Sequence, residues 1–217
     1  MIIYVDLEHA RYQNDPLTGQ ESLALQLRNK YRVEAIAGES CLVVRYEKVT
    51  PSLVRELNAT AVLISGCATD FAHYDEADLA GLRAIYKEAS QPILGFCGGH
   101  QLMAQAYGAQ IGPTGSDGGA PIWEKGFMSV QPLAPHPLFA NLSEEVVVYQ
   151  EHYWEVKEVP AGFVPLAKSD VCGIQAMAHG RLPLFGVQFH PEEYDDGHVD
   201  GRQLLINFFN IVKESSP

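Results

Sequence analysis

One cysteine of this chain stands between two glycines, directly after an apolar run. The segment PILGFCGGHQ (residues 92–101) holds Cys97 with Gly95 two residues before it and Gly99 two residues after it. A strand that turns sharply into a helix lifts one side chain clear of the sheet, and the crowded turn favours glycine at these two positions. The positive end of the following helix favours a thiolate. The pattern predicts a nucleophile, and the alternative is an inert cysteine buried in a tight turn.

A cysteine nucleophile needs a base, and the base needs a group that orients it. The segment FGVQFHPEE (residues 185–193) offers both, because an apolar run ends in His190 and Glu192 follows two residues later. We expect Pro191 to fix the backbone so that the imidazole and the carboxylate turn toward each other. His190 is then predicted to take the thiol proton, and Glu192 to hold the tautomer and stabilise the imidazolium.

The two segments together resemble the class I (triad-type) glutamine amidotransferases. Residues 95–101 (GFCGGHQ) match the family's G-x-C-x-G-x-Q elbow, and residues 186–192 (GVQFHPE) match its G-x-Q-F-H-P-E motif. The order of cysteine, histidine and glutamate also agrees, and the resemblance extends over nearly the whole chain. It implies a flavodoxin-like α/β fold: an open, mostly parallel sheet with helices on both faces. It also implies that Cys97 attacks the side-chain amide of glutamine, forms a γ-glutamyl thioester and releases ammonia.

The resemblance further implies an oxyanion hole made of the Gly98 N–H and an N–H from the loop after the strand 61–65. In relatives that loop has the sequence S-G-G-P, whereas this chain has SGCAT at residues 65–69. By position, Cys67 supplies the second N–H, which requires backbone angles that suit a residue with a side chain. The cysteine either locks the active conformation permanently or permits it only when a partner docks. We expect the second, because coupling to a partner prevents futile loss of glutamine.

Four residues are predicted to contact the substrate by the same resemblance: Gly66, Gln101, Glu151 and His152. Many relatives have serine before the histidine, so a carboxylate at that position either attracts the α-ammonium group or changes the substrate. Other polar residues follow the first and third strands, where α/β sheets place ligands. For Asp6, Glu8 and His9 we favour solvated loop positions over a site role, and Asp70, His73 and Asp75 are weaker candidates for the pocket wall.

The first half of the chain alternates apolar runs with helical spacing. Strands are predicted at 2–5, 33–37, 41–47, 61–65 and 92–96, and helices at 18–31, from 51, at 75–90 and at 98–107. Leu23, Leu27 and Tyr31 supply the spacing of the first helix, and Thr50-Pro51 is a typical helix start. This alternation predicts a parallel sheet with helices on both faces.

The second half is rich in β segments and ends in an amphipathic helix. A loop is predicted at 114–121, β segments between 127 and 189, and the last helix at 201–212. No repeat or linker is evident, so residues 1–217 are predicted to form a single glutaminase domain.

Composition narrows the functional classes further. The formal net charge of −12 argues against nucleic acid and anionic membranes as partners. The four cysteines show neither C-x-x-C pairs nor the spacing of a zinc site, so we expect free thiols, a reducing cytoplasmic location and neither a metal nor a cofactor. We find no signal-peptide pattern and no apolar stretch of membrane-spanning length.

The leading hypothesis is the glutaminase subunit of an amidotransferase that supplies ammonia to a partner synthase. The motifs do not single out the guanylate, anthranilate, histidine or pyridoxal pathway. A stand-alone γ-glutamyl hydrolase or peptidase with the same triad is the first alternative, motivated by the altered loop at 65–69. A non-catalytic regulatory protein of the same fold is the second alternative.

Overall fold

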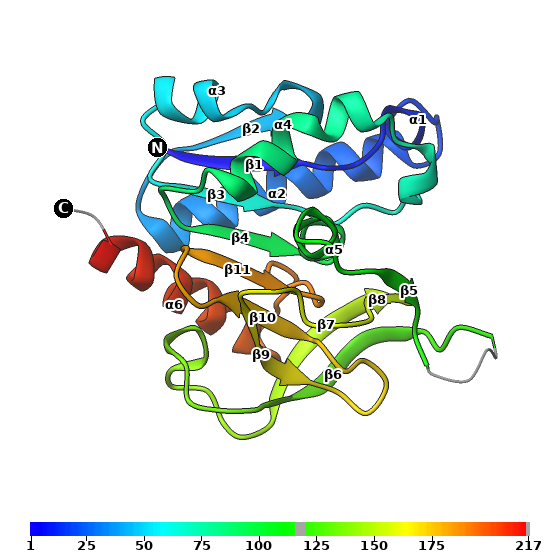
Figure 1. The fold of residues 1–217 in the computed structure, drawn as a ribbon, viewed down its shortest axis with the longest axis vertical. Coiled ribbons are helices and arrows are strands. Elements are labelled where there is room, and N and C mark those ends of the chain that lie inside the picture. The colour runs from blue at the N-terminus through cyan, green and yellow to red at the C-terminus, as the bar shows by residue number, and fades with distance from the viewer. Residues whose placement is uncertain (116–119, 216–217) are drawn as a thin grey trace.

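The computed structural model describes residues 1–115 and 120–215, and its centre is a nine-stranded sheet in the order β2-β1-β3-β4-β11-β10-β9-β6-β7 (Figure 1). Five strands run parallel to one another: β1 (Ile2–Asp6), β2 (Cys41–Arg45), β3 (Ala61–Ile64), β4 (Ile93–Phe96) and β11 (Leu184–Val187). Their order is the flavodoxin-like one. The predicted α/β fold class is therefore confirmed.

The other four strands extend this sheet with antiparallel pairs. They are β6 (Glu124–Pro132), β7 (Val146–His152), β9 (Phe163–Lys168) and β10 (Ala176–His179). A separate two-stranded sheet pairs β5 (Ile111–Pro113) with β8 (Trp154–Val156). The predicted loop at 114–121 lies partly outside the described residues.

Helices cover both faces of the parallel part of the sheet (Figure 1). They are α1 (Ala10–Gln13), α2 (Gly19–Ala37), α3 (Pro51–Glu56), α4 (Glu76–Lys87), α5 (Gly98–Ala106) and α6 (Asp200–Ser215). Short 3₁₀ turns lie at Tyr46–Lys48, Phe71–His73 and Pro137–Phe139. Within the part of the chain that the structure describes, no helix is both long and apolar enough to span a bilayer.

The two faces of β1 bury alternate side chains, as the period of a strand requires. Ile2 and Tyr4 pack in one apolar cluster with residues of α2 and α6, while Ile3 and Val5 pack in a second cluster with residues of α4 and α5. Both faces of the central strands are thus buried, which explains why their sequences are continuous apolar runs.

Helix α2 differs from its prediction in length. It continues to Ala37, so the strand predicted at residues 33–37 is wrong. Val33 is fully buried against the sheet, and Gly38 ends the helix with a left-handed φ of 71° and an N–H bonded to the Glu34 carbonyl. Tertiary packing of the buried face therefore overrides the β propensity of Val33 and Ile36.

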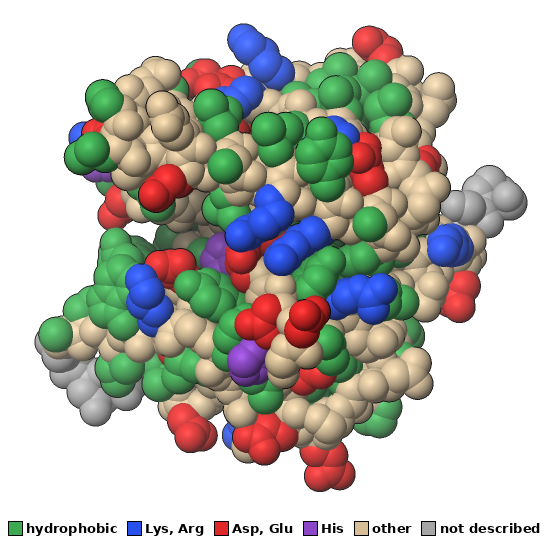
Figure 2. Space-filling view, turned by 180° about the vertical axis from the view of Figure 1, so that it is seen from behind, with side chains coloured by type: hydrophobic (Ala, Val, Ile, Leu, Met, Phe, Trp, Pro, Cys, Tyr) green, Lys and Arg blue, Asp and Glu red, His purple; other side chains and the backbone are tan. Residues whose placement is uncertain are grey.

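The buried face of α2 is also not its apolar one. Leu23, Leu27 and Tyr31 are 57%, 51% and 62% exposed, whereas Ser22, Gln26, Asn29 and Val33 are buried. Figure 2 views the molecule from behind, and it shows apolar side chains on the upper part of that surface. The polar residues of α2 instead line the cavity described below.

Candidate active site

Cys97 occupies a sharp turn between β4 and α5. Its φ of 44° and ψ of −105° lie outside the usual regions for a residue with a side chain, a conformation that costs about 1–3 kcal/mol. The turn also needs its glycines, because a Cβ on Gly95 would lie 2.6 Å from the carbonyl carbon of Gly99, and a Cβ on Gly99 would lie 2.5 Å from the Ile64 oxygen. Strain and close packing of this kind are typical of a nucleophile elbow.

His190 lies directly after β11 and is fixed at both its backbone and its ring. Its N–H donates to the Tyr149 carbonyl at 2.8 Å, and its Nδ1 lies 3.0 Å from Oε1 of Glu192. Burial alone lowers the pKa of His190, but the Glu192 charge and hydrogen bonds with Cys97 and Glu192 outweigh it and raise the pKa well above its ordinary value. The site therefore favours an imidazolium next to the sulfur.

Gly66 packs against both of the side chains that are predicted to react. A Cβ on Gly66 would lie 2.8 Å from Cε1 of His190 and 3.2 Å from Cβ of Cys97. The structure thus brings Cys97, His190 and Glu192 together at one end of the sheet. Helix α2 holds the backbone around Glu192. Arg32 donates to the backbone oxygen of Glu192 and, at 3.0 Å, to that of Tyr194.

The loop after β3 lies beside the first turn of α5. The Cys67 nitrogen is 3.1 Å from the point where a Cβ on Gly98 would stand. Among the described residues, neither the Cys67 N–H nor the Gly98 N–H donates to another backbone group. Cys67 does not share the positive φ of Cys97, so its backbone suits a residue with a side chain. Two backbone donors without a backbone acceptor therefore lie beside the elbow.

The thiol of Cys67 is a poor competitor for the role of nucleophile. Burial, followed by the nearby Cys97, raises the pKa of Cys67 well above its ordinary value. A thiol with a raised pKa is mostly protonated near neutral pH and reacts slowly. All four cysteines are free, as the sequence predicts.

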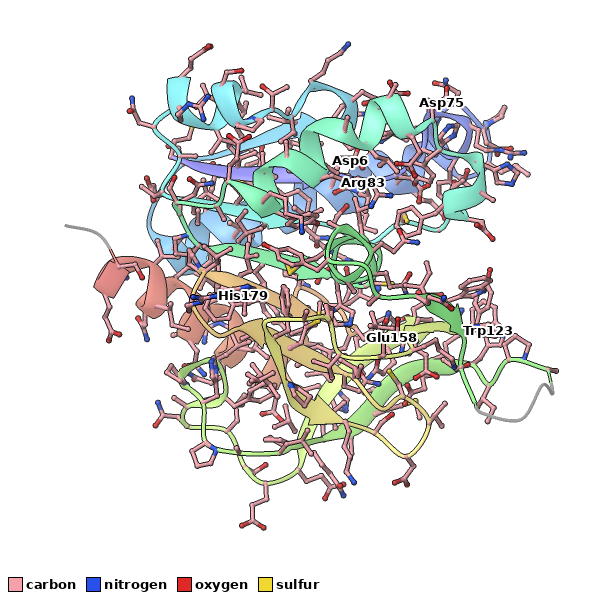
Figure 3. All side chains as sticks on the ribbon, viewed as in Figure 1. Asp6, Asp75, Arg83, Trp123, Glu158 and His179 are labelled. Atoms are coloured by element: carbon pink, nitrogen blue, oxygen red, sulfur yellow. The ribbon has the colours of Figure 1, made fainter. Side chains whose placement is uncertain are left out.

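A cavity of about 390 Å³ is lined by Cys97, His190 and Glu192. Figure 2, the view from behind, shows a hollow in the surface. The wall of the cavity includes the predicted substrate contacts Gly66, Gln101, Glu151 and His152. Asp70 also lines it, whereas His73 and Asp75 do not. Trp123, beside β5 and β8 in Figure 3, lies at its outer edge. The α2 contribution was not predicted from the sequence, and it comes from Glu21, Ser22, Leu25, Gln26 and Asn29.

The inner wall of the cavity is already held by hydrogen bonds. Gln101 donates from Nε2 to the Trp154 carbonyl at 3.0 Å and to Oε1 of Gln188 at 3.1 Å. His152 is buried, with Nδ1 3.0 Å from the Trp154 oxygen and Nε2 3.1 Å from Oε2 of Glu124. Both ring nitrogens of His152 therefore have partners within the protein. The ring shapes the wall of the cavity but has no free nitrogen to bind a substrate.

Glu151 occupies the outer wall. Its Oε1 forms an ion pair with Lys125 at 2.8 Å, and Tyr149 donates to its Oε2 at 3.4 Å. Its charge is thus partly balanced from β6, although the side chain remains exposed.

Asp6, the last residue of β1, and Glu8, two residues further on, are both buried, which corrects our preference for solvated positions. Asp6 is 3% and Glu8 5% exposed. Asp6 accepts hydrogen bonds from Gln26 at 3.2 Å and from Arg45 at 3.1 Å, and Glu8 lines the cavity. Their position at the carboxyl end of β1 was the available signal.

One known protein family matches most of this chain. The family model for glutamine amidotransferase class-I matches residues 29–212. The chain belongs to the class-I glutamine amidotransferases. This amidotransferase is 41% identical over 138 residues to a GMP synthase [glutamine-hydrolyzing] subunit of Archaeoglobus fulgidus, a match that covers 63% of this chain and 71% of the relative. The corresponding subunit of Methanopyrus kandleri is 39% identical over 171 residues, which cover 76% of this chain and 81% of the relative.

Solved structures share the fold of this amidotransferase. A putative GMP synthase subunit protein from Thermoplasma acidophilum superposes with a TM-score of 0.77 at 23% identity, covering 99% of this chain and 94% of the other. A glutamine amido transferase from Methylobacillus flagellatus gives a TM-score of 0.70 at 17% identity, covering 100% and 94%. At these identities the likeness concerns the fold alone.

Proposed function

We propose that this amidotransferase hydrolyses glutamine at Cys97 and passes the ammonia to the synthase subunit of a GMP synthase. The observation that carries the chemistry is the joint packing of Cys97 and His190 on Gly66, with Glu192 bonded behind the imidazole. The observation that carries the partner is the likeness to glutamine-hydrolyzing subunits of GMP synthases. The charge, the fold and the family are consistent with a single-domain cytoplasmic protein.

The first half of the reaction forms the thioester. His190 takes the proton of Cys97, and Sγ attacks the side-chain amide carbon of glutamine. The negative charge that develops on the amide oxygen is placed against the N–H groups of Gly98 and Cys67. His190 then returns the proton to the amide nitrogen, the C–N bond breaks, and ammonia leaves a γ-glutamyl thioester on Cys97.

The second half restores the enzyme. A water molecule gives a proton to His190 and attacks the thioester carbon, and the same N–H groups stabilise the second oxyanion. The C–S bond breaks, glutamate leaves, and Cys97 recovers its proton from His190. Glu192 stabilises the imidazolium in both halves, since its Oε1 stays bonded to Nδ1.

The partner is tested by reconstitution. The purified chain is mixed with the synthase subunit of a GMP synthase from the same source, and GMP formation is measured with glutamine or with ammonium as the nitrogen donor. We expect glutamine-dependent synthesis only when the chain is present, and ammonium-dependent synthesis without it. Release of glutamate from γ-glutamyl amines but not from glutamine would instead identify a γ-glutamyl hydrolase.

A further inference from the structure

Glu8 lies under the loop that supplies the oxyanion donor and binds it through both carboxylate oxygens. Its Oε2 accepts the Ala68 N–H at 2.6 Å. Its Oε1 accepts the Thr69 hydroxyl at 2.7 Å and the Thr69 N–H at 3.3 Å. Hydrogen bonds to a charged acceptor are about twice as strong as neutral ones, so one buried carboxylate ties down two consecutive residues of the loop.

Glu8 is itself held in place by the end of the sheet. Its N–H donates to Oδ1 of Asp6 at 3.1 Å. The neighbouring Leu7 N–H donates to Oγ of Ser65 at 3.0 Å, and the Ser65 N–H donates to the Val5 carbonyl at 3.0 Å. The segment directly before Glu8 and the end of β3 that leads into the loop are therefore hydrogen-bonded to each other, so Glu8 is held beside the loop.

The anchor acts next to the oxyanion donor. A peptide unit is planar, so holding the Ala68 N–H also fixes the Cys67 carbonyl on the opposite edge of the same unit. This restricts rotation at the Cys67 Cα, on whose other side lies the Cys67 nitrogen, close to Gly98. The loop has a cysteine at position 67 and an alanine at position 68, and the Glu8 carboxylate, which follows β1, supplies this restraint.

We propose that Glu8 is a positioning residue that holds the loop 66–69 in its active conformation, so that the Cys67 N–H meets the oxyanion. This inference rests on the proposed function, because it assigns the Cys67 N–H its role in glutamine hydrolysis. Glu8 acts through the loop and does not exchange protons with the substrate. Its effect is therefore expected in kcat, where the oxyanion forms, and not in the binding of glutamine.

The test compares Glu8→Gln with the wild type in the full chain. The amide retains the size of the side chain but replaces one acceptor oxygen with a donor, so either the Ala68 N–H or the Thr69 N–H loses its acceptor. Loss of an oxyanion donor costs about 10²–10³-fold in kcat, and for a loosened donor we expect about 10- to 100-fold, with KM within about twofold. The rate of Cys97 alkylation by iodoacetamide should not change, because that reaction needs no oxyanion hole.

Two further variants separate positioning from general damage. Glu39→Gln is the matched control, because the Glu39 carboxylate also accepts a threonine hydroxyl, that of Thr60 at 2.8 Å. Glu39 precedes β2 and lies at the opposite end of the parallel strands from Cys97. This variant should keep wild-type kcat. Thr69→Val removes only the hydroxyl donor, so a smaller fall of about 2- to 5-fold is expected. If Glu8→Gln does not fold, Thr69→Val carries the test, and an unchanged kcat there overturns the proposal.

Amide hydrogen exchange distinguishes this proposal from the proposed function. Exchange at Ala68 or Thr69 should be at least about tenfold faster in Glu8→Gln, since a freed amide loses protection. Wild-type kcat or unchanged exchange in Glu8→Gln overturns the role of Glu8. If the wild type, with its partner present, releases no glutamate from glutamine, the proposed function fails, and exchange alone then decides whether Glu8 anchors the loop.

Discussion

Nδ1 of His190 lies 3.0 Å from Oε1 of Glu192. The Arg32 side chain of α2 donates to the Glu192 carbonyl, and the His190 N–H donates to the Tyr149 carbonyl of β7. The carboxylate is 3% exposed, so its charge acts on the imidazole with little screening by water. Burial lowers the pKa of His190, but the charge of Glu192 is the largest of the effects that raise it, and contacts with Cys97 add to it.

Glu192→Gln should keep the fold but lower kcat by about 10²- to 10⁴-fold, if the cost measured in serine triads applies here. Loss of the charge also lowers the pKa of His190, so the imidazolium–thiolate pair becomes less populated. Alkylation of Cys97 by iodoacetamide should then slow most at mildly acidic pH. A variant with wild-type kcat would show that another group orients His190.

Cys67→Gly tests whether the oxyanion loop is preformed or waits for a partner. The structure favours the preformed state, because Cys67 needs no positive φ and Glu8 anchors the next two residues. Glycine adds backbone freedom worth about 0.5–1 kcal/mol, so kcat of the chain alone should stay level or fall by a few fold. A clear rise in the rate of glutamate release without a partner would support gating instead.

His100 makes stability depend on pH. It is fully buried beside the elbow, and burial lowers its pKa to about 3. An unfolded chain binds a proton on histidine below about pH 6.5, whereas the folded chain does not until near pH 3. Stability should therefore fall as pH drops through this window, by up to about 1.4 kcal/mol per pH unit from this group.

Urea unfolding at pH 7 and pH 5 measures this dependence. His100→Gln cannot titrate, so its stability should differ less between the two pH values than that of the wild type. Equal differences in the two proteins would mean that other groups account for the acid sensitivity.

The inverted face of α2 is checked by a pair of substitutions. Leu27→Gln changes a side chain that is 51% exposed and should alter the free energy of unfolding by no more than about 0.5 kcal/mol. Val33→Ala empties a fully buried position and should cost about 1–3 kcal/mol. The reverse order would mean that Leu27 is covered in solution, for example by a second chain.

The triad could be predicted because its chemistry is local in sequence. Gly95, Cys97 and Gly99 lie within one short turn, and His190 and Glu192 lie within another. Each segment therefore indicates its part of the triad without any long-range contact. The parallel strands were predictable for the same reason, since each is a continuous apolar run.

Long-range contacts could not be predicted in this way. Glu8 is 60 positions from Ala68, and only the pairing of β1 with β3 brings them together. The apolar spacing of Leu23, Leu27 and Tyr31 identified a helix correctly, yet the polar residues of that helix face the cavity. Periodicity identifies a helix, but it cannot say which face the rest of the protein covers.

The central claim is tested most directly by the site of covalent modification. The protein is incubated with a glutamine-directed chloroketone or diazo compound, digested and analysed by peptide mass spectrometry, with Cys97→Ala and Cys67→Ala treated in parallel. We predict label on Cys97 alone, loss of both label and glutamate release in Cys97→Ala, and retention of label in Cys67→Ala. Label on Cys67 with Cys97 unmodified would contradict the assignment of the nucleophile.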